Sequence, residues 1–173
     1  NSQTREQMNY SHSGNINTKW NVSGTYGYGG NCDGVTAGPH AVTSANDNTY
    51  CYDRNGNMLS GAGRNIIWAD FGKPTEISRG SDVKVRFEYG PNRNRIRRLD
   101  TKDNFDTQTT TSYVGNYEKV VKSTGVVDER HYVGGFLVIN KTTGGSNHGL
   151  KENYLLKDNL GSVVSTIDIA KLI

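Results

Sequence analysis

The segment Val83-Lys84-Val85-Arg86-Phe87-Glu88-Tyr89 alternates between apolar and charged residues at every position. Side chains on a β-strand point to opposite faces in turn, so this pattern puts one face against a core and the other in water. Gly90-Pro91-Asn92 then favours a turn, after which residues 93–100 can return antiparallel. A helix is excluded here, because its 3.6-residue period would scatter the apolar side chains around the axis.

The same order of strand, turn and strand recurs towards the C-terminus. Apolar residues make up only 33% of the chain, whereas 21 of its 173 residues are Gly, and such a composition favours short strands joined by tight turns. No long segment has the apolar period of a helix, although residues 163–173 can be read as a strand or a short helix. The expected strands lie at residues 110–114, 117–122, 126–133, 136–141 and 154–157.

Several turn segments are copies of one another. Residues 10–16, YSHSGNI, align with residues 52–58, YDRNGNM, and looser copies occur at 68–75, 89–95 and 154–162. Recurrence at intervals of about 20 residues indicates a repeat architecture, in which each strand pair needs its neighbours to bury its apolar face. The sequence therefore predicts an all-β fold of antiparallel hairpins that occupies residues 1–173 as one repeat region.

The two cysteines, Cys32 and Cys51, flank a Gly- and Asn-rich stretch. They can form a disulfide that closes this loop, or they can remain two free thiols, and the sequence favours neither. The chain has no CxxC pair and no cluster of histidines at metal-ligand spacing. We therefore predict neither a metal site nor a cofactor.

Motifs of catalysis are absent from the sequence. The four histidines, at positions 12, 40, 131 and 148, form no HxH or HExxH pattern, and there is no GxSxG. Asp53, Asp70 and Asp158 lie in or beside turns, where a carboxylate can accept backbone N–H bonds. We therefore predict structural functions for these aspartates, and we expect the chain to carry no catalytic residue.

Charge and hydropathy exclude two further classes of function. The net charge is +3, and the basic run at 93–98 alternates with other residues along an expected strand, so a solvated face is favoured over nucleic-acid binding. No run of 18 apolar residues exists, so no membrane span is predicted. The chain begins at Asn1 without Met and stops at Ile173, which is the pattern we expect of a piece of a longer chain.

The copy at residues 52–58 resembles the Tyr-Asp-x-x-Gly-Asn-x motif of the Rhs/YD-repeat family through Tyr52, Asp53, Gly56 and Asn57. Many relatives have His where Asn159 stands, residues 31–36 look like an insertion, and the resemblance ends near Ile167. Further blocks resemble the core region of that family in the expected order: AGPHAVTS at 37–44, FEYGPNRNR at 87–95, TSYVGNYEKV at 111–120, HYVGG at 131–135 and YLLKDNLGSVV at 154–164.

This resemblance implies a curved β-ribbon that forms part of the cocoon-shaped shell of bacterial polymorphic toxins and toxin complexes, with similar repeats in teneurins. The implied function is a non-catalytic structural one, in which the shell of an exported or cell-surface virulence protein encapsulates or presents a C-terminal toxin domain. The implied partners are the rest of the shell, the toxin domain and a secretion apparatus. The residues implied to hold the repeats are Tyr52, Asp53, Gly56, Asn57, Tyr154, Asp158, Leu160 and Gly161.

Two other hypotheses follow from the residues themselves. Trp20, Tyr26 and Tyr28 lie near one another in the sequence and could form an aromatic platform, as in a surface module that binds carbohydrate or protein. An enzyme is the weakest of the three hypotheses. Independently of function, exposed strand edges predict self-association of the chain.

Overall fold

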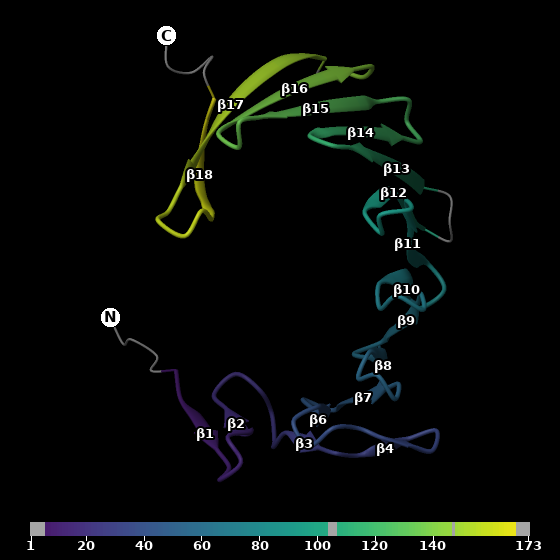
Figure 1. Ribbon diagram of the computed structural model, residues 1–173, viewed down its shortest axis with the longest axis vertical. Helices are drawn as coiled ribbons and strands as arrows, with labels where there is room; N and C mark the ends of the chain where they lie inside the picture. The colour runs from purple at the N-terminus through teal and green to yellow at the C-terminus, as the bar shows by residue number, and fades with distance from the viewer. Residues whose placement is uncertain (1–5, 104–106, 147, 169–173) are drawn as a thin grey trace. The chain divides into compact units, whose positions relative to one another are not determined.

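The computed structural model describes residues 6–103, 107–146 and 148–168, which form eighteen β-strands and no helix (Figure 1). The predicted all-β fold is confirmed. Residues Val163–Asp168 form a strand rather than a helix, and residues 169–173 of that expected segment lie outside the described part. The strands are β1 (Met8–Tyr10), β2 (Ile16–Lys19), β3 (Gly27–Tyr28), β4 (Asn31–Cys32), β5 (Val35–Thr36), β6 (Val42–Ala45), β7 (Asn48–Tyr52), β8 (Met58–Gly61), β9 (Arg64–Trp68), β10 (Pro74–Arg79), β11 (Val83–Tyr89), β12 (Arg95–Lys102), β13 (Thr107–Val114), β14 (Tyr117–Lys122), β15 (Val127–Val133), β16 (Leu137–Thr143), β17 (Gly149–Lys157) and β18 (Val163–Asp168).

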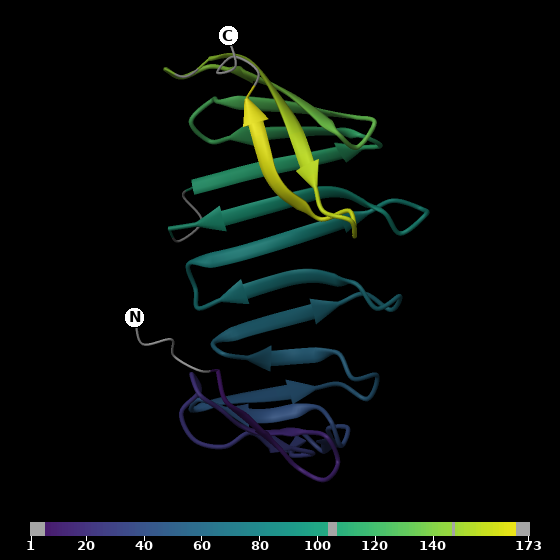
Figure 2. The same ribbon diagram turned by 90° about the vertical axis from the view of Figure 1, so that its left-hand side faces the viewer.

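The chain divides into two compact units, one up to Gly80 and one from Ser81. In the first unit, strands β3, β6, β7, β8, β9 and β10 follow one another in a sheet, while β1–β2 and β4–β5 are separate two-stranded sheets. In the second unit, every strand from β11 to β18 pairs antiparallel with the next strand in the sequence (Figure 2). The second unit is therefore a meander, as is the run from β6 to β10 in the first unit, and short turns fix the strand order of both.

The strand register of the second unit separates its side chains into two faces, because residues directly opposite each other point the same way. Face A is defined by the row of opposed residues Phe87, Arg98, Thr111, Val120, Asp128 and Thr142. Face B is defined by the next row, which consists of Arg86, Leu99, Thr110, Val121, Val127 and Thr143.

Face A is the more buried of the two faces. Thr111, Val120 and Asp128 on this face are at most 9% exposed, whereas Val114 and Leu150 on face B are 71% and 63% exposed. The predicted strand with one buried apolar face at residues 83–89 is therefore confirmed, because the apolar residues of β11 lie on the more buried face. Beyond β11, however, face A carries mainly polar residues. They can lie on the more buried face because their charged and hydroxyl groups bond one another across the strands.

The sheet lacks a deep apolar core. Among the described residues, no large side chain is fully buried, and the buried hydrophobic residues are Ala45 and Val120. Backbone pairing and cross-strand side-chain contacts must therefore supply most of the stability.

One cross-strand contact offers a direct test of this dependence. The ring of Tyr50 in β7 covers Gly61 in β8, where a Cβ atom would lie 2.2 Å from Tyr50 Cδ1. We expect Gly61→Val to lower the free energy of unfolding by about 1–3 kcal/mol, because the ring must leave its position. Urea unfolding followed by tryptophan fluorescence measures this, with Ser60→Val as the neighbouring control. Equal midpoints for the two variants would contradict the prediction.

Candidate functional site: hairpin turns and a polar sheet face

Six turns share one backbone hydrogen-bond pattern. In each, the first residue donates its N–H to the carbonyl four residues later, and the fourth residue donates its N–H to the carbonyl of the first. The fourth residue, which is Arg93 in the turn that begins at Gly90 and glycine in the other five, has a positive φ in all six cases, which is the geometry of a three-residue hairpin loop with a G1-type bulge. The copies found in the sequence thus share a local structure. The turns begin at Ser11, Asp53, Ala69, Gly90, Lys122 and Asp158.

The predicted residues Asp53, Gly56 and Asn57 come together in one of these turns. Oδ1 of Asp53 accepts the backbone N–H groups of Asn55 at 2.9 Å and Asn57 at 2.8 Å, and its Oδ2 accepts the Asn57 side-chain amide at 2.9 Å. This amide bond is the main cause that lowers the pKa of Asp53. Gly56 adopts a φ of 82°, which a side chain would make costly. The carboxylate therefore clamps the turn.

Tyr52, just before this turn, bonds across the sheet. Its hydroxyl donates to the carbonyl oxygen of Val42 in β6 at 2.7 Å, and burial raises the pKa of Tyr52. Trp68 before the next turn donates its Nε1–H to the carbonyl oxygen of Met58 at 2.9 Å. Sequence reasoning missed this shared contact, although the choice of Tyr or Trp, each with a polar hydrogen, was a signal for it.

The second predicted group is only partly assembled. Oδ1 of Asp158 accepts the N–H groups of Leu160 and Ser162 at 2.9 and 2.8 Å, and Gly161 has a φ of 86°. Leu160 is 85% exposed at the tip of the turn. Tyr154 lies apart from them on face B, where it stacks on Phe136 with ring centroids 6.5 Å apart. Its position relative to the turn therefore differs from that of Tyr52.

Two contacts hold the Gly-rich segment of the first unit. Cys32 in β4 and Cys51 in β7 form a disulfide with a Cα–Cα distance of 5.5 Å. His40 Nδ1 lies 2.7 Å from Oδ1 of Asn15, whose side-chain amide donates to the carbonyl of Pro39 at 2.9 Å. These contacts fasten residues distant in sequence to the strands and turns around them.

The three aromatic residues of the alternative hypothesis differ in exposure. Trp20 is 49% exposed, whereas Tyr26 and Tyr28 are half-buried. The Tyr28 hydroxyl donates to the carbonyl oxygen of Ile16 at 2.8 Å. Because its hydroxyl is bonded to the backbone, Tyr28 is better explained by packing within the unit than by a place in an exposed binding platform.

Face A carries a set of paired charges centred on Asp128, which is 8% exposed. Its carboxylate accepts the Thr142 hydroxyl at 2.7 Å and lies 3.0 Å from Nζ of Lys122. The bond from Thr142, followed by that from Lys122, lowers the pKa of Asp128. Glu118 likewise lies 3.4 Å from Arg130. A carboxylate held ionised in this way suits a structural ion pair better than general acid catalysis.

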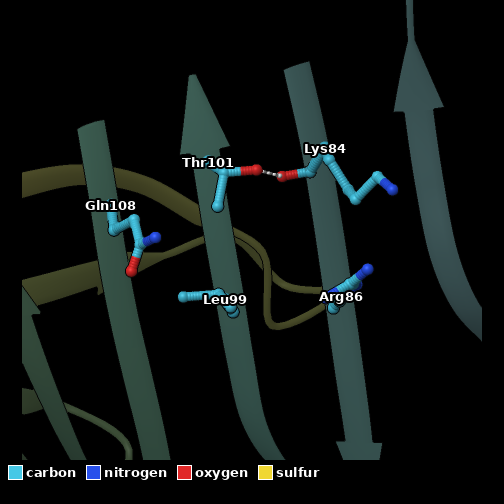
Figure 3. A pocket seen from close by; sticks show the side chains of 5 residues that line it. All are labelled: Lys84, Arg86, Leu99, Thr101 and Gln108. Carbon is cyan, nitrogen blue, oxygen red and sulfur yellow. Dashed lines mark hydrogen bonds between the residues drawn. The ribbon is translucent and has the colours of Figure 1, made fainter. Parts of the chain in front are cut away.

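Face B has a shallow hollow of about 250 Å³ across β11, β12 and β13 (Figure 3). The Thr101 hydroxyl donates to the carbonyl of Lys84 at 3.1 Å and so holds two of the strands together. The hollow is lined by Lys84, Arg86, Leu99, Thr101 and Gln108. These residues include two cationic side chains but no carboxylate, imidazole or thiol.

The described residues include no helix with the length and hydropathy of a membrane span. They also contain no group of three or more His, Cys, Asp or Glu side chains that could hold a metal ion.

The Asp53 clamp leads to a prediction. We expect Asp53→Ala to destabilise the first unit and Asp53→Asn to do so less, because asparagine can still accept the two backbone N–H bonds. The lowered pKa means that the carboxylate stabilises the fold above its unfolded pKa and loses this effect as the pH falls through the folded value. The loss of unfolding free energy in both variants relative to the wild type, measured by urea unfolding at several pH values, should therefore become smaller in acid. A loss that does not change with pH would contradict this prediction.

Comparison with known proteins supports the fold alone. No protein-family model matches the chain, and no curated protein matches its sequence. The crystal structure of TcdB2-TccC3-Cdc42 is similar to this chain, with a TM-score of 0.67, 14% sequence identity and coverage of 94% of this chain. The chain spans 9% of the length of that neighbour. At this level of identity the comparison establishes a shared all-β fold alone.

Proposed function

We propose that this chain is a non-catalytic wall segment of an Rhs-type toxin shell in an exported bacterial protein. The observation that carries this proposal is the meander itself, in which each strand of the second unit pairs with its sequence neighbours and large apolar side chains stay exposed. Such a sheet suits a wall, because it covers area with few residues, whereas a pocket-bearing enzyme needs a deeper scaffold. The fold shared with TcdB2-TccC3 supports the same proposal.

The proposal assigns functions to the turns and the edge. Turns closed by Asp53 and Asp158 fix the hairpin register, so that successive strands can extend the wall. Strand β18 ends the strand order of the second unit, and its residues 163–166 are exposed. In the shell this edge pairs with a further strand of the parent chain, whereas the isolated chain is expected to self-associate through it.

Protease protection tests the proposed function. The complete gene product that contains this chain is treated with trypsin, and its C-terminal segment is compared with the same segment expressed alone. Slower cleavage within the complete product, and faster cleavage after Gly61→Val, would support encapsulation. Equal cleavage rates in the three samples would reject it.

A further inference from the structure

Asn55 is followed by Gly56 at the tip of the turn that begins at Asp53, and this is the one Asn-Gly pair in the sequence. Both residues are exposed. A Cβ atom on Gly56 would meet no other atom within 4 Å, so water and hydroxide can reach the peptide bond between the two residues. Asparagine is a thermally labile residue in proteins. The surroundings of this pair therefore bear on its chemical lifetime.

The Asn-Gly pair has a reaction available that needs no enzyme. Hydroxide takes the proton from the backbone N–H of Gly56, and this nitrogen attacks Cγ of Asn55. The bond from Cγ to Nδ2 then breaks, and the departing nitrogen takes up a proton and leaves as ammonia. One water molecule opens the resulting succinimide at either carbonyl, which gives aspartate or isoaspartate. Glycine favours the attack because no Cβ atom stands beside its nitrogen.

The folded turn holds the attacking nitrogen in a hydrogen bond. The N–H of Gly56 donates to the carbonyl oxygen of Asp53 at 3.1 Å. Oδ1 of Asp53 accepts the N–H groups of Asn55 at 2.9 Å and Asn57 at 2.8 Å, so the residues on both sides of Gly56 are also fixed. A hydrogen-bonded N–H loses its proton only when the structure around it opens. The attack therefore requires the turn to open first.

A second turn of the same type provides an internal comparison. Asn92 occupies the position of Asn55 in the turn that begins at Gly90. The next residue, Arg93, has a φ of 57° and donates its N–H to the Gly90 carbonyl at 2.8 Å. The backbone pattern is thus the same, but the attacking nitrogen belongs to arginine, whose Cβ atom obstructs the approach to Cγ. Asn92 is therefore expected to be the less reactive asparagine.

We propose that Asn55 is a deamidation site that the Asp53 turn protects while it is closed, so that the reaction marks chains in which this hairpin has opened. The product keeps the turn open. Aspartate at position 55 adds a carboxylate close to that of Asp53, and the like charges repel. Isoaspartate adds an atom to the backbone of the loop, so β7 and β8 lose their register. The chemistry is the same whether or not the chain forms a wall.

Peptide mapping by mass spectrometry tests the proposal on the complete chain, incubated in mildly alkaline buffer with and without guanidinium chloride. We expect Asn55 to convert at least about tenfold more slowly in the folded chain, because opening must break hydrogen bonds to a charged group. In the unfolded chain, Asn92 should convert more slowly than Asn55. Equal rates at Asn55 in the two conditions, or equal rates at the two asparagines, would overturn the proposal.

Variants of two aspartates separate opening of this turn from other effects. Asp53→Ala should raise the rate at Asn55 in the folded chain by about tenfold, with Asp53→Asn in between. Asp158→Ala removes the same clamp in the second unit, so it is the matched control and should leave this rate unchanged. The proposal fails if Asp53→Ala reacts no faster than the wild type, or if Asp158→Ala reacts as fast as Asp53→Ala. If Asp53→Ala does not fold, Asp53→Asn takes its place, because it keeps an acceptor.

The stability of the product provides a second measurement. Converted protein, separated from the wild type by ion exchange, should unfold at a lower urea concentration when it is followed by tryptophan fluorescence. Asn55→Gln is the control, because its longer side chain disfavours the succinimide ring, and it should keep its midpoint after the same incubation. An unchanged midpoint in the converted wild type would show that the turn closes again, against the proposal.

Discussion

Replacement of both Cys32 and Cys51 by serine is expected to lower the free energy of unfolding of the first unit by about 3 kcal/mol, which is typical for a disulfide across a loop of this size. The effect should be large here because β4 pairs only with β5 in the described strand order, as a sheet separate from that of β7. The disulfide thus adds a covalent cross-link, beyond the backbone itself, between this hairpin and the longer sheet.

Both tryptophans, Trp20 and Trp68, lie in the first unit, so their fluorescence reports its unfolding in urea. The double variant avoids the reactive thiol that a single substitution would leave. Wild-type protein in reductant is the matched control and should unfold at the same urea concentration as the double variant. An unchanged midpoint in both samples would show that β4 and β5 are held by other contacts.

Asp128→Ala is expected to lower the free energy of unfolding of the second unit by about 2 kcal/mol, which is within the range for a hydrogen bond to a charged group. The substitution removes the acceptor of the Thr142 hydroxyl and the partner of Lys122. Lys122 is 45% exposed, so its ammonium group can be solvated by water and the cost stays below that of breaking a fully buried ion pair. Circular dichroism during urea unfolding measures the change.

The pH dependence separates the charge of Asp128 from its packing. Since its folded pKa is lowered, the carboxylate stabilises the fold above its unfolded pKa of about 3.9 and loses this contribution as the pH falls through the folded value. The difference in unfolding free energy between the wild type and Asp128→Ala should therefore become smaller in acid. Lys122→Met should cost less than Asp128→Ala, because Thr142 is the principal partner. A deficit that is independent of pH would assign the effect to packing.

The sequence predicted much of the strand order of the second unit. Its alternation at residues 83–89 coincides with β11, and the turn formers at 90–92 fall in a turn of the shared type. The aligned copies at 10–16, 52–58 and 68–75 also contain that turn. These features are local, so residue type and spacing are enough to determine them.

Features that depend on register could not be predicted in the same way. Asp128 meets Thr142 only because the loop between β15 and β16 sets those residues opposite each other. The loop at 144–146 lies close to the turn at 125–126, and no local pattern encodes this contact. The stacking of Tyr154 on Phe136 likewise depends on register, and the repeat copy at 154–162 does not show it.

The neighbour-to-neighbour pairing of β11 to β18 has a consequence for how the chain acquires its structure. Every strand pairing in this meander joins segments that are synthesised one after the other, so loop closure costs little entropy at each step. Strands can then add in the order in which they leave the ribosome, with each finished hairpin serving as the template for the next. Folding of this unit is expected to proceed as growth from one end, at a rate set by the slowest hairpin rather than by a search among distant segments.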